Sequence, residues 1–273
     1  MKMVGKHRNI IYYLDQGLPL AGTLVKPYTH VIIGAFHLQA DGAIHLNNEP
    51  PESPRFAALW RDAAAVRASG RKVLMMLGGA CNGTWRYIDR NGCAAVETLL
   101  RVMDAFQLDG VDLDWEEWRD YPYDPEQLFS QLISDLSERT RRKPLLTMAP
   151  VARQLWGKGP GPPGLYRKIL ANTGGRINWF NVQFYSGFGS LQRPADYRRA
   201  VRAGFEPHRL VAGSLTGPQA GEGYVDPGSL ALTVRELAQE YPDFGGVAGW
   251  EYCYTAGTPW ADYLRRAMRV NGR

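Results

Sequence analysis

The chain has 273 residues, of which 45% are hydrophobic and 22% are charged, with a formal net charge of +5. This is ordinary globular composition, and the length suits one large α/β barrel or two small domains. The only dense basic cluster, Arg139 to Lys143, falls at the end of an expected helix, where cations interact favourably with the helix dipole. The charges therefore favour a solvated surface over a nucleic-acid partner.

Cysteines and apolar runs restrict the class of protein further. Cys81, Cys93 and Cys253 are too few for a disulfide framework, although one bridge stays open, and none has the spacing of a metal site. No run approaches the roughly 18 apolar residues of a membrane span. No secretory signal is visible in the basic start of the chain, so we expect it to be intracellular, exported by another route, or made without a leader.

Eight short apolar runs recur at intervals of roughly 20–40 residues, the spacing of a βα repeat. The predicted strands are 9–13, 30–36, 72–77, 110–116, 145–149, 179–185, 210–215 and 246–251. Apolar spacing and capping residues predict helices over 93–107, 125–142 and 227–241, and one more from Ser53-Pro54 to Gly70. The spacer after the first strand is too short for a helix to be predicted.

This alternation of strands and helices predicts a parallel sheet, and eight units favour its closure into a single (β/α)8 TIM barrel, one α/β domain over residues 1–273. No glycine-rich phosphate loop follows the first strand, which argues against a dinucleotide-binding fold. We expect a monomer without a cofactor or partner protein.

The segment 109–116, Asp-Gly-Val-Asp-Leu-Asp-Trp-Glu, is the most informative part of the sequence. Because alternate side chains of a strand share a face, Asp112, Asp114 and Glu116 form a row at steps of about 6.6 Å that points into a barrel. The opposite face is apolar and can pack beneath helices: Val111, Leu113 and Trp115. Three desolvated carboxylates are costly unless they share protons or meet a cation, so the row predicts a functional site.

Glu116 falls at the carboxyl end of this strand, where barrels place their active sites. Negative neighbours and a partly apolar pocket raise the pKa of a glutamate, which suits a general acid near neutral pH. Two alternatives stay open, an acidic edge strand that faces solvent and a divalent metal site. The metal site has little support, because the five histidines form no paired motif.

The same segment resembles the D-x-x-D-x-D-x-E signature of glycoside hydrolase family 18, the chitinases and endo-β-N-acetylglucosaminidases. Segments that resemble the family's third, fifth, sixth and eighth strands follow in the family's order, at 72–79, 146–150, 181–185 and 245–250. The resemblance covers the whole chain and is closest to the short, plant-type form. It implies a catalytic (β/α)8 barrel.

Family chemistry is retaining, and the nucleophile is the substrate's own 2-acetamido group. The resemblance implies that Glu116 protonates the glycosidic oxygen and then activates water. Asp114 would orient the acetamide nitrogen and stabilise the oxazolinium-like intermediate, and Asp112 would share a proton with Asp114. Tyr185 would donate its hydroxyl to the acetamide oxygen.

The resemblance also implies a set of substrate-binding residues. Trp250 would form the apolar floor beneath the sugar, Gln183 would point at it, and Met148 would line the pocket. Gly79, with Gly78, would leave room for close backbone approach. A structural interpretation stays open for each: core packing, a buried amide or an ordinary turn. Aromatic residues in the expected loops could stack on further sugars or pack in their loops: Trp85, Trp118, Tyr121, Trp156 and Tyr254.

The sequence departs from the family pattern at two places. Met76 stands where the family usually has a serine that supports the acidic row, which could shift the carboxylate pKa values. The interval from Leu215 to Gly246 leaves no space for the small inserted α+β domain of longer members, which predicts an open groove and internal cleavage.

We therefore expect a retaining endo-glycosidase of chitin or chitooligosaccharides, with cleavage of N-glycan cores as the near alternative. A sugar-binding protein without catalysis and a barrel recruited to other chemistry are the competing classes.

Overall fold

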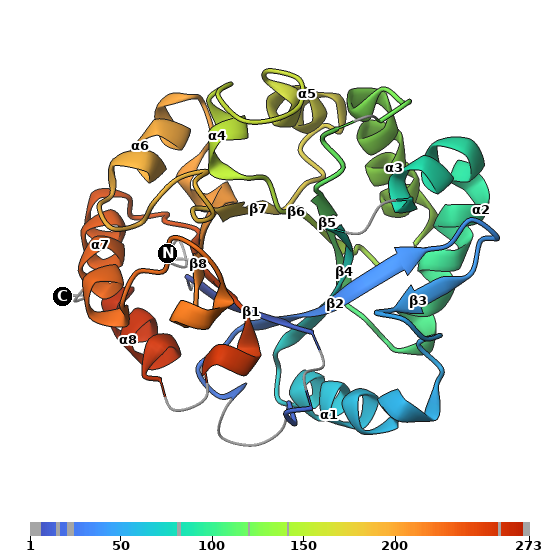
Figure 1. Ribbon diagram of the computed structural model, residues 1–273, viewed down its shortest axis with the longest axis horizontal. Coiled ribbons are helices and arrows are strands. Elements are labelled where there is room, and N and C mark those ends of the chain that lie inside the picture. Colours follow the sequence, from blue (N-terminus) through green and yellow to red (C-terminus); the bar gives the residue numbers. More distant parts are fainter. Residues whose placement is uncertain are drawn as a thin grey trace.

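The computed structural model describes residues 7–14, 17–20, 25–80, 83–119, 121–140, 142–255 and 258–269, which form a barrel ringed by helices (Figure 1). The barrel strands are β1 Arg8–Tyr13, β2 His30–Leu38, β4 Lys72–Gly79, β5 Gly110–Trp115, β6 Leu145–Met148, β7 Trp179–Gln183, β8 Leu210–Leu215 and β9 Gly246–Trp250. Each strand pairs in parallel with the next in this series, and β1 also pairs with β9, which closes the sheet. The predicted single (β/α)8 barrel is confirmed.

Helices form the outer layer of the barrel (Figure 1). They are α1 Ala57–Ala68, α2 Thr84–Ala105, α3 Pro125–Arg139, α4 Ala152–Leu155, α5 Leu165–Asn172, α6 Ala195–Arg202, α7 Pro227–Glu240 and α8 Trp260–Ala267. Helices α3 and α7 begin in the same way: an aspartate, Asp124 or Asp226, accepts hydrogen bonds from two backbone N–H groups of the first turn, and a proline follows it. A short strand, β3 (Ile44–Leu46), pairs antiparallel with the end of β2.

The alternation of strand residues separates two apolar regions. A small cluster fills the barrel interior: Ile10, Tyr12, Ile32, Ala35, Leu74, Met76, Trp179, Val211 and Ala248. A much larger cluster lies between the strands and the helices and includes the outward face of β5, namely Val111, Leu113 and Trp115. The predicted division of β5 into an inward acidic face and an outward apolar face is therefore confirmed.

The eight predicted strands all form, and none of their ends differs from the prediction by more than two residues. β5 ends at Trp115 and β7 ends at Gln183, so Glu116 and Tyr185 lie just beyond their strands rather than within them. Both still project from the carboxyl end of the barrel, because that is where parallel strands end together.

The helix predictions were less accurate at their ends. α2 begins at Thr84, nine residues before the predicted start, and Asn91 (φ −134°, ψ 36°) breaks its helical geometry before the stretch that carries the predicted apolar stripe. The helix predicted from Ser53 is a 3₁₀ turn, Pro54–Phe56, followed by α1, and α3 and α7 end three residues and one residue early. The short helices α4, α5, α6 and α8 were not predicted, since each offers only two to four buried residues.

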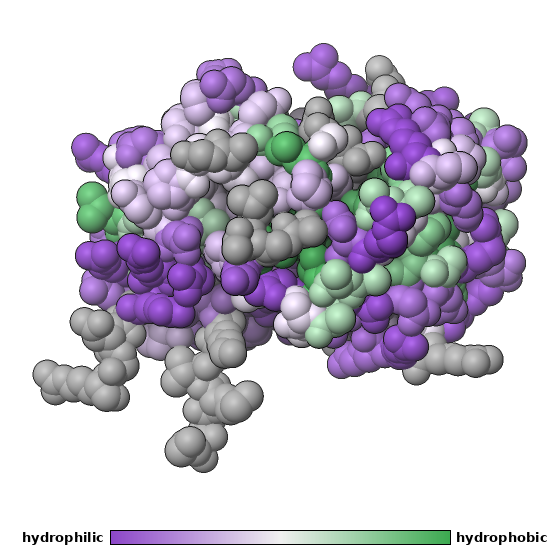
Figure 2. Space-filling view, turned by 90° about the horizontal axis from the view of Figure 1, so that it is seen from below, coloured by the Kyte–Doolittle hydropathy of each residue, from purple (hydrophilic) through white to green (hydrophobic). Residues whose placement is uncertain are grey.

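The outer surface is mixed in character. On the side shown in Figure 2, hydrophilic residues cover much of the surface and hydrophobic residues form separate patches. Within the described ranges, no helix has the length and apolar content to cross a membrane. Cys93 and Cys253 are free thiols, and Cys81 lies outside the described residues.

Candidate active site

We call Asp112 the lower end of the acidic row, deep in the barrel, and Asp114 with Glu116 its upper end, towards the barrel mouth. The carboxyl group of Asp112 is fully buried, and three neutral groups donate hydrogen bonds to it. The Tyr12 hydroxyl donates to Oδ2 of Asp112 at 2.6 Å. Thr147 Oγ1 and Asn181 Nδ2 donate to Oδ1 of Asp112 at 2.5 and 2.9 Å. The Asn181 amide is itself oriented, because its oxygen accepts the indole N–H of Trp179 at 2.9 Å. Asp112 is therefore fixed from β1, β6 and β7 at once.

The upper end of the row shares one donor between two carboxyl groups. Gln183 Nε2 lies 3.2 Å from Asp114 Oδ1 and 3.4 Å from Glu116 Oε1, and it donates to the backbone oxygen of Ala149 at 2.9 Å. Asp114 is buried, whereas Glu116 is partly exposed at the barrel mouth. Gln183 thus ties the two acids together and fixes its own amide on the backbone.

Burial raises the pKa of all three carboxyl groups, but the opposing contributions differ. At Asp112, hydrogen bonds from Thr147, Tyr12 and Asn181 offset the effect of burial. At Asp114, the charges of Glu116 and Asp112 add to burial and hold the pKa well above its usual range. Burial raises the pKa of Glu116, and the Gln183 hydrogen bond opposes it. The upper end of the row therefore holds a proton to higher pH than an ordinary carboxyl group would.

An aromatic pocket stands over this upper end. Tyr185 and Trp250 line it together with Asp114 and Gln183. The ring of Trp250 lies 5.4 Å from that of Tyr12, centroid to centroid, so the indole packs at the top of the interior cluster. Burial and then the charges of Asp114, Glu116 and Asp112 raise the pKa of Tyr185 well above its usual value, which keeps its hydroxyl a donor.

Two glycines at the end of β4 permit close approach to the row. Gly78 has φ +100°, and a Cβ there would lie 2.3 Å from the backbone oxygen of Asp114. Gly79 has φ +91°, and a Cβ there would lie 3.0 Å from Met76 Cε and 3.8 Å from Asp114 Oδ2. Met76 is buried in the barrel interior and pairs in register with Asp112. A thioether therefore stands beside the carboxyl groups, where a hydroxyl would have been a polar partner.

The prediction for Met148 is wrong. Its side chain lies in the outer cluster, between strand and helices, and it pairs in register with the outward-facing Leu113. Its neighbours Thr147 and Ala149 face inward: Thr147 binds Asp112, and Ala149 lines the pocket. The sequence prediction was displaced by one residue, which exchanges the two faces of a strand.

The aromatic residues that were predicted to lie in loops fall into two groups, one buried in the core and one partly exposed. Trp85 is fully buried against Phe129 and cannot meet a sugar. Trp118 is partly exposed two residues beyond Glu116, and its ring lies 5.4 Å from that of Phe188, three residues beyond Tyr185. The two rings contact each other in the loops that follow β5 and β7. Tyr121 packs edge-on against Trp115, and Trp156 and Tyr254 are partly buried.

Three partners of Asp112 were not singled out from the sequence: Tyr12, Thr147 and Asn181. Strand alternation could have placed each on an inward face, but which inward residues meet depends on the register around the barrel. Glu117 was also missed. It turns away from the row and accepts hydrogen bonds from Gly83 N at 2.7 Å and the Tyr123 hydroxyl at 3.3 Å, so of two adjacent glutamates only Glu116 can act in the pocket.

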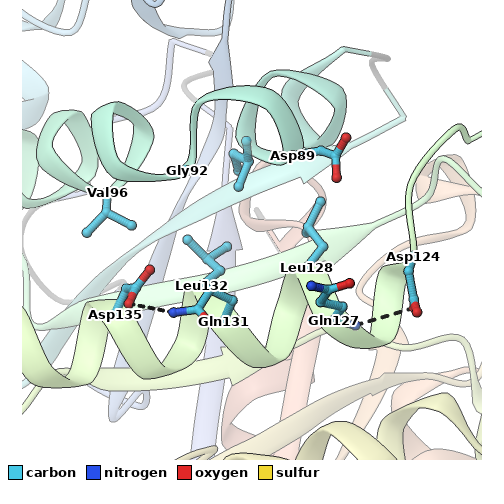
Figure 3. A pocket seen from close by; sticks show the side chains of 10 residues that line it. Asp89, Gly92, Val96, Asp124, Gln127, Leu128, Gln131, Leu132 and Asp135 are labelled. Carbon is cyan, nitrogen blue, oxygen red and sulfur yellow. Dashed lines mark hydrogen bonds between the residues drawn. The ribbon is translucent and has the colours of Figure 1, made fainter.

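A second depression lies outside the barrel, between α2 and α3 near the break at Asn91 (Figure 3). Several of its polar groups take part in helix capping and surface pairs: Asp124 Oδ1 accepts from Gln127 N, and Gln131 donates to Asp135 at 2.8 Å. Over the described part of the chain, no three side chains of His, Cys, Asp or Glu are arranged to hold a metal ion. The barrel mouth is therefore the candidate active site.

Comparison with known proteins gives the family of the chain. The family model for glycosyl hydrolases family 18 matches residues 5–215. Chitinase 1 of Rhizopus niveus is 26% identical over 208 residues, which are 70% of this chain and 39% of that protein. Chitinase 2 of Rhizopus oligosporus is 26% identical over 212 residues, 71% of this chain and 36% of that protein. The chain thus spans less than two fifths of the length of these curated relatives.

Two solved structures are similar over nearly their whole length. A fungal endo-β-N-acetylglucosaminidase from glycosyl hydrolase family 18 has a TM-score of 0.86 and 33% identity, covering 97% of this chain and 99% of that one. A chitinase from Aspergillus fumigatus has a TM-score of 0.81 and 35% identity, covering 90% and 91% of the two chains.

Proposed function

This chain belongs to glycosyl hydrolase family 18, and we propose that it is a retaining endo-glycosidase of β-1,4-linked N-acetylglucosamine polymers, with residues 1–273 as one catalytic domain. The observation that carries the proposal is the arrangement of Asp114, Gln183 and Glu116 at the barrel mouth. It places a partly exposed acid with a raised pKa beside a buried one, under an aromatic pocket.

In the first step, Glu116 donates its proton to the glycosidic oxygen as the bond to the anomeric carbon breaks. The carbonyl oxygen of the substrate's own 2-acetamido group forms a bond to that carbon, giving a cyclic oxazolinium. Asp114 accepts the acetamide N–H, and its negative charge stabilises the cation. The Tyr185 hydroxyl donates to the acetamide oxygen and holds it near the reacting carbon.

In the second step, Glu116 is a carboxylate and accepts a proton from water. The water oxygen attacks the anomeric carbon from the face that the leaving group vacated, so the product keeps the β configuration. Asp112 shares a proton with Asp114 and so adjusts its charge between the two steps. Trp250 forms the floor under the distorted sugar. Gln183 hydrogen-bonds to Asp114 and Glu116 and so holds the two acids in place relative to each other.

Two substrates have specific support. Chitin and its oligosaccharides are favoured by the chitinases among the relatives and neighbours. The chitobiose core of N-glycans is the second candidate, because the neighbour with a TM-score of 0.86 is an endo-β-N-acetylglucosaminidase. Between β8 and β9 there is only a 3₁₀ turn, Pro218–Ala220, and α7, so no inserted domain encloses the barrel mouth. An open barrel mouth suits cleavage within a polymer and also a bulky glycan.

The test is to incubate the wild-type protein and Glu116→Gln with chitohexaose and with a neutral N-glycan, and to follow the products by mass spectrometry. We expect the wild type to cleave internal bonds of at least one substrate, and the variant to cleave neither at a comparable rate. Binding without cleavage by the wild type would instead identify a sugar-binding protein. Neither binding nor cleavage would indicate a barrel recruited to other chemistry.

A further inference from the structure

A groove of about 630 Å³ with a mixed polar and apolar lining lies beside the barrel mouth, between the β2–β3 hairpin and the first turns of α2. It is at the same end of the barrel as Glu116, because its lining includes His37 and Leu38 at the carboxyl end of β2 and Gly83, which follows β4. No aspartate or glutamate lines it, whereas its lining includes Arg86 and Arg90. The groove therefore has a net positive charge that nothing in its own wall neutralises.

The two arginines lack partners. Both are exposed, and in the described ranges neither has an ion pair or a hydrogen bond. Elsewhere on the outer layer, some arginines are paired, Arg139 with Glu97 and Arg198 with Glu236 and Glu240. Others, such as Arg202 and Arg235, have no ion pair in the described ranges. Arg86 and Arg90 are four residues apart on one helix, a spacing at which like charges repel and destabilise the helix. An anion between them would relieve that repulsion.

The groove is fixed to the catalytic mouth by hydrogen bonds. Asn47, in its lining, accepts from Ala35 N at 3.1 Å and donates to the backbone oxygen of Leu14 at 3.2 Å, at the ends of β2 and β1. On the other wall, Gly83 N donates to Glu117, the neighbour of Glu116. The groove therefore keeps a constant position relative to a glycan bound at the acidic row.

The remaining lining suits sugar hydroxyls. Gln39 and Asn48 supply amides that can both donate and accept. His37 Nδ1 is buried without a hydrogen-bond partner in the described ranges, and burial lowers the pKa of the ring, so it is neutral at pH 7. A neutral polar wall with two unpaired guanidinium groups fits a sugar that carries a negative group.

We propose that this groove binds an acidic substituent, a carboxylate, sulfate or phosphate, on a glycan whose scissile bond lies at Glu116. A guanidinium group binds each of these with paired, charge-assisted hydrogen bonds. The inference rests on the proposed glycosidase function, which supplies the glycan, and it adds a preference for acidic over neutral forms.

The experiment compares matched substrates. The probes are chitopentaose with and without 6-O-sulfate, and a biantennary N-glycan with and without terminal sialic acid, at 0.15 M salt so that only short-range charge effects remain. The variant is Arg86→Gln with Arg90→Gln. The matched control is Arg202→Gln with Arg235→Gln, two exposed arginines on α6 and α7, across the barrel from α2 (Figure 1).

We expect the wild type to favour at least one acidic form, and the groove variant to lose about tenfold more kcat/KM on that form than on its neutral match. The control should keep the wild-type ratio. The proposal is overturned if the wild type shows no preference for either acidic form, or if both double variants lose the preference equally, which would indicate net charge alone.

Cleavage of the neutral probes reports the proposed function separately. If the wild type cleaves no probe, that function is wrong, and the groove is judged from the binding of fluorescently labelled probes. Charge-dependent binding that only the groove variant loses would then support the groove, and equal binding of acidic and neutral probes would reject it.

Discussion

The two ends of the acidic row have the same chemical groups and different surroundings. Asp112, at the lower end, accepts hydrogen bonds from three neutral donors on three strands. Asp114 and Glu116, at the upper end, share the amide of Gln183. Burial raises the carboxyl pKa values at both ends. The supply of donors makes the lower end a fixed support and leaves the upper end able to exchange protons.

The largest expected effect is on catalysis at the upper end. Glu116→Gln should lower kcat by about 10³-fold, because general acid–base catalysis contributes about 10² to 10⁴. The measurement is the initial rate on chitohexaose. Glu117→Gln is the matched control: Glu117 faces away from the row, so its variant should stay within about tenfold of wild type. Equal losses in the two variants would contradict the assignment.

Removing one of the three hydrogen-bond donors to Asp112 should destabilise the fold. Tyr12→Phe leaves a buried carboxyl oxygen without its partner, which we expect to lower the free energy of unfolding by about 1–3 kcal/mol in urea titrations. Tyr252→Phe removes a hydroxyl that donates to the backbone oxygen of Pro19 at the surface, and it should cost less. A Tyr12→Phe protein as stable as wild type would show that Asp112 does not need this support.

The upper end should also make the stability of the fold depend on pH. The pKa values of Asp114 and Glu116 are raised in the folded state, so the native protein retains protons that the unfolded chain has lost. Stability contributed by these protons is present at low pH and is lost as the pH rises from the ordinary carboxyl range through the folded pKa values.

Thermal unfolding between pH 4 and pH 8 measures this loss. Relative to Glu116→Gln, the wild type should lose more stability across that range. The glutamine cannot ionise, and its presence also removes one charge that raises the pKa of Asp114. Parallel curves for the two proteins would mean that Glu116 has an ordinary pKa in the fold.

The smallest expected effect concerns Met76. Met76→Ser places a hydroxyl beside the row, where a hydrogen bond to a carboxylate favours its charged form. The basic limb of the kcat profile should therefore move to lower pH by less than about one unit. Met76→Ala leaves a similar cavity without a hydroxyl, so it should lose stability without moving the limb. A limb that moves equally in both variants would assign the shift to the cavity.

The sequence was sufficient for the barrel and for the alternation of β5, because the apolar residues Val111, Leu113 and Trp115 alternate with acidic ones, which is a local property of one strand. It was insufficient wherever the register between strands decides. Tyr12 donates to Asp112 across 100 residues of sequence. Which residues of β6 point into the barrel is set by the pairing of β6 with β5, and this pairing turns Met148 outward. The start of α2 was hidden because the break at Asn91 interrupts its periodicity.

The central claim is that the upper acids assist a nucleophile that belongs to the substrate. The most direct measurement is proton NMR of the anomeric signals during the first minutes of chitohexaose or N-glycan cleavage. We predict that the β-anomer appears first and equilibrates later, and that Glu116→Gln releases no product on that time scale. Initial release of the α-anomer would mean direct attack by water, and it would contradict this mechanism.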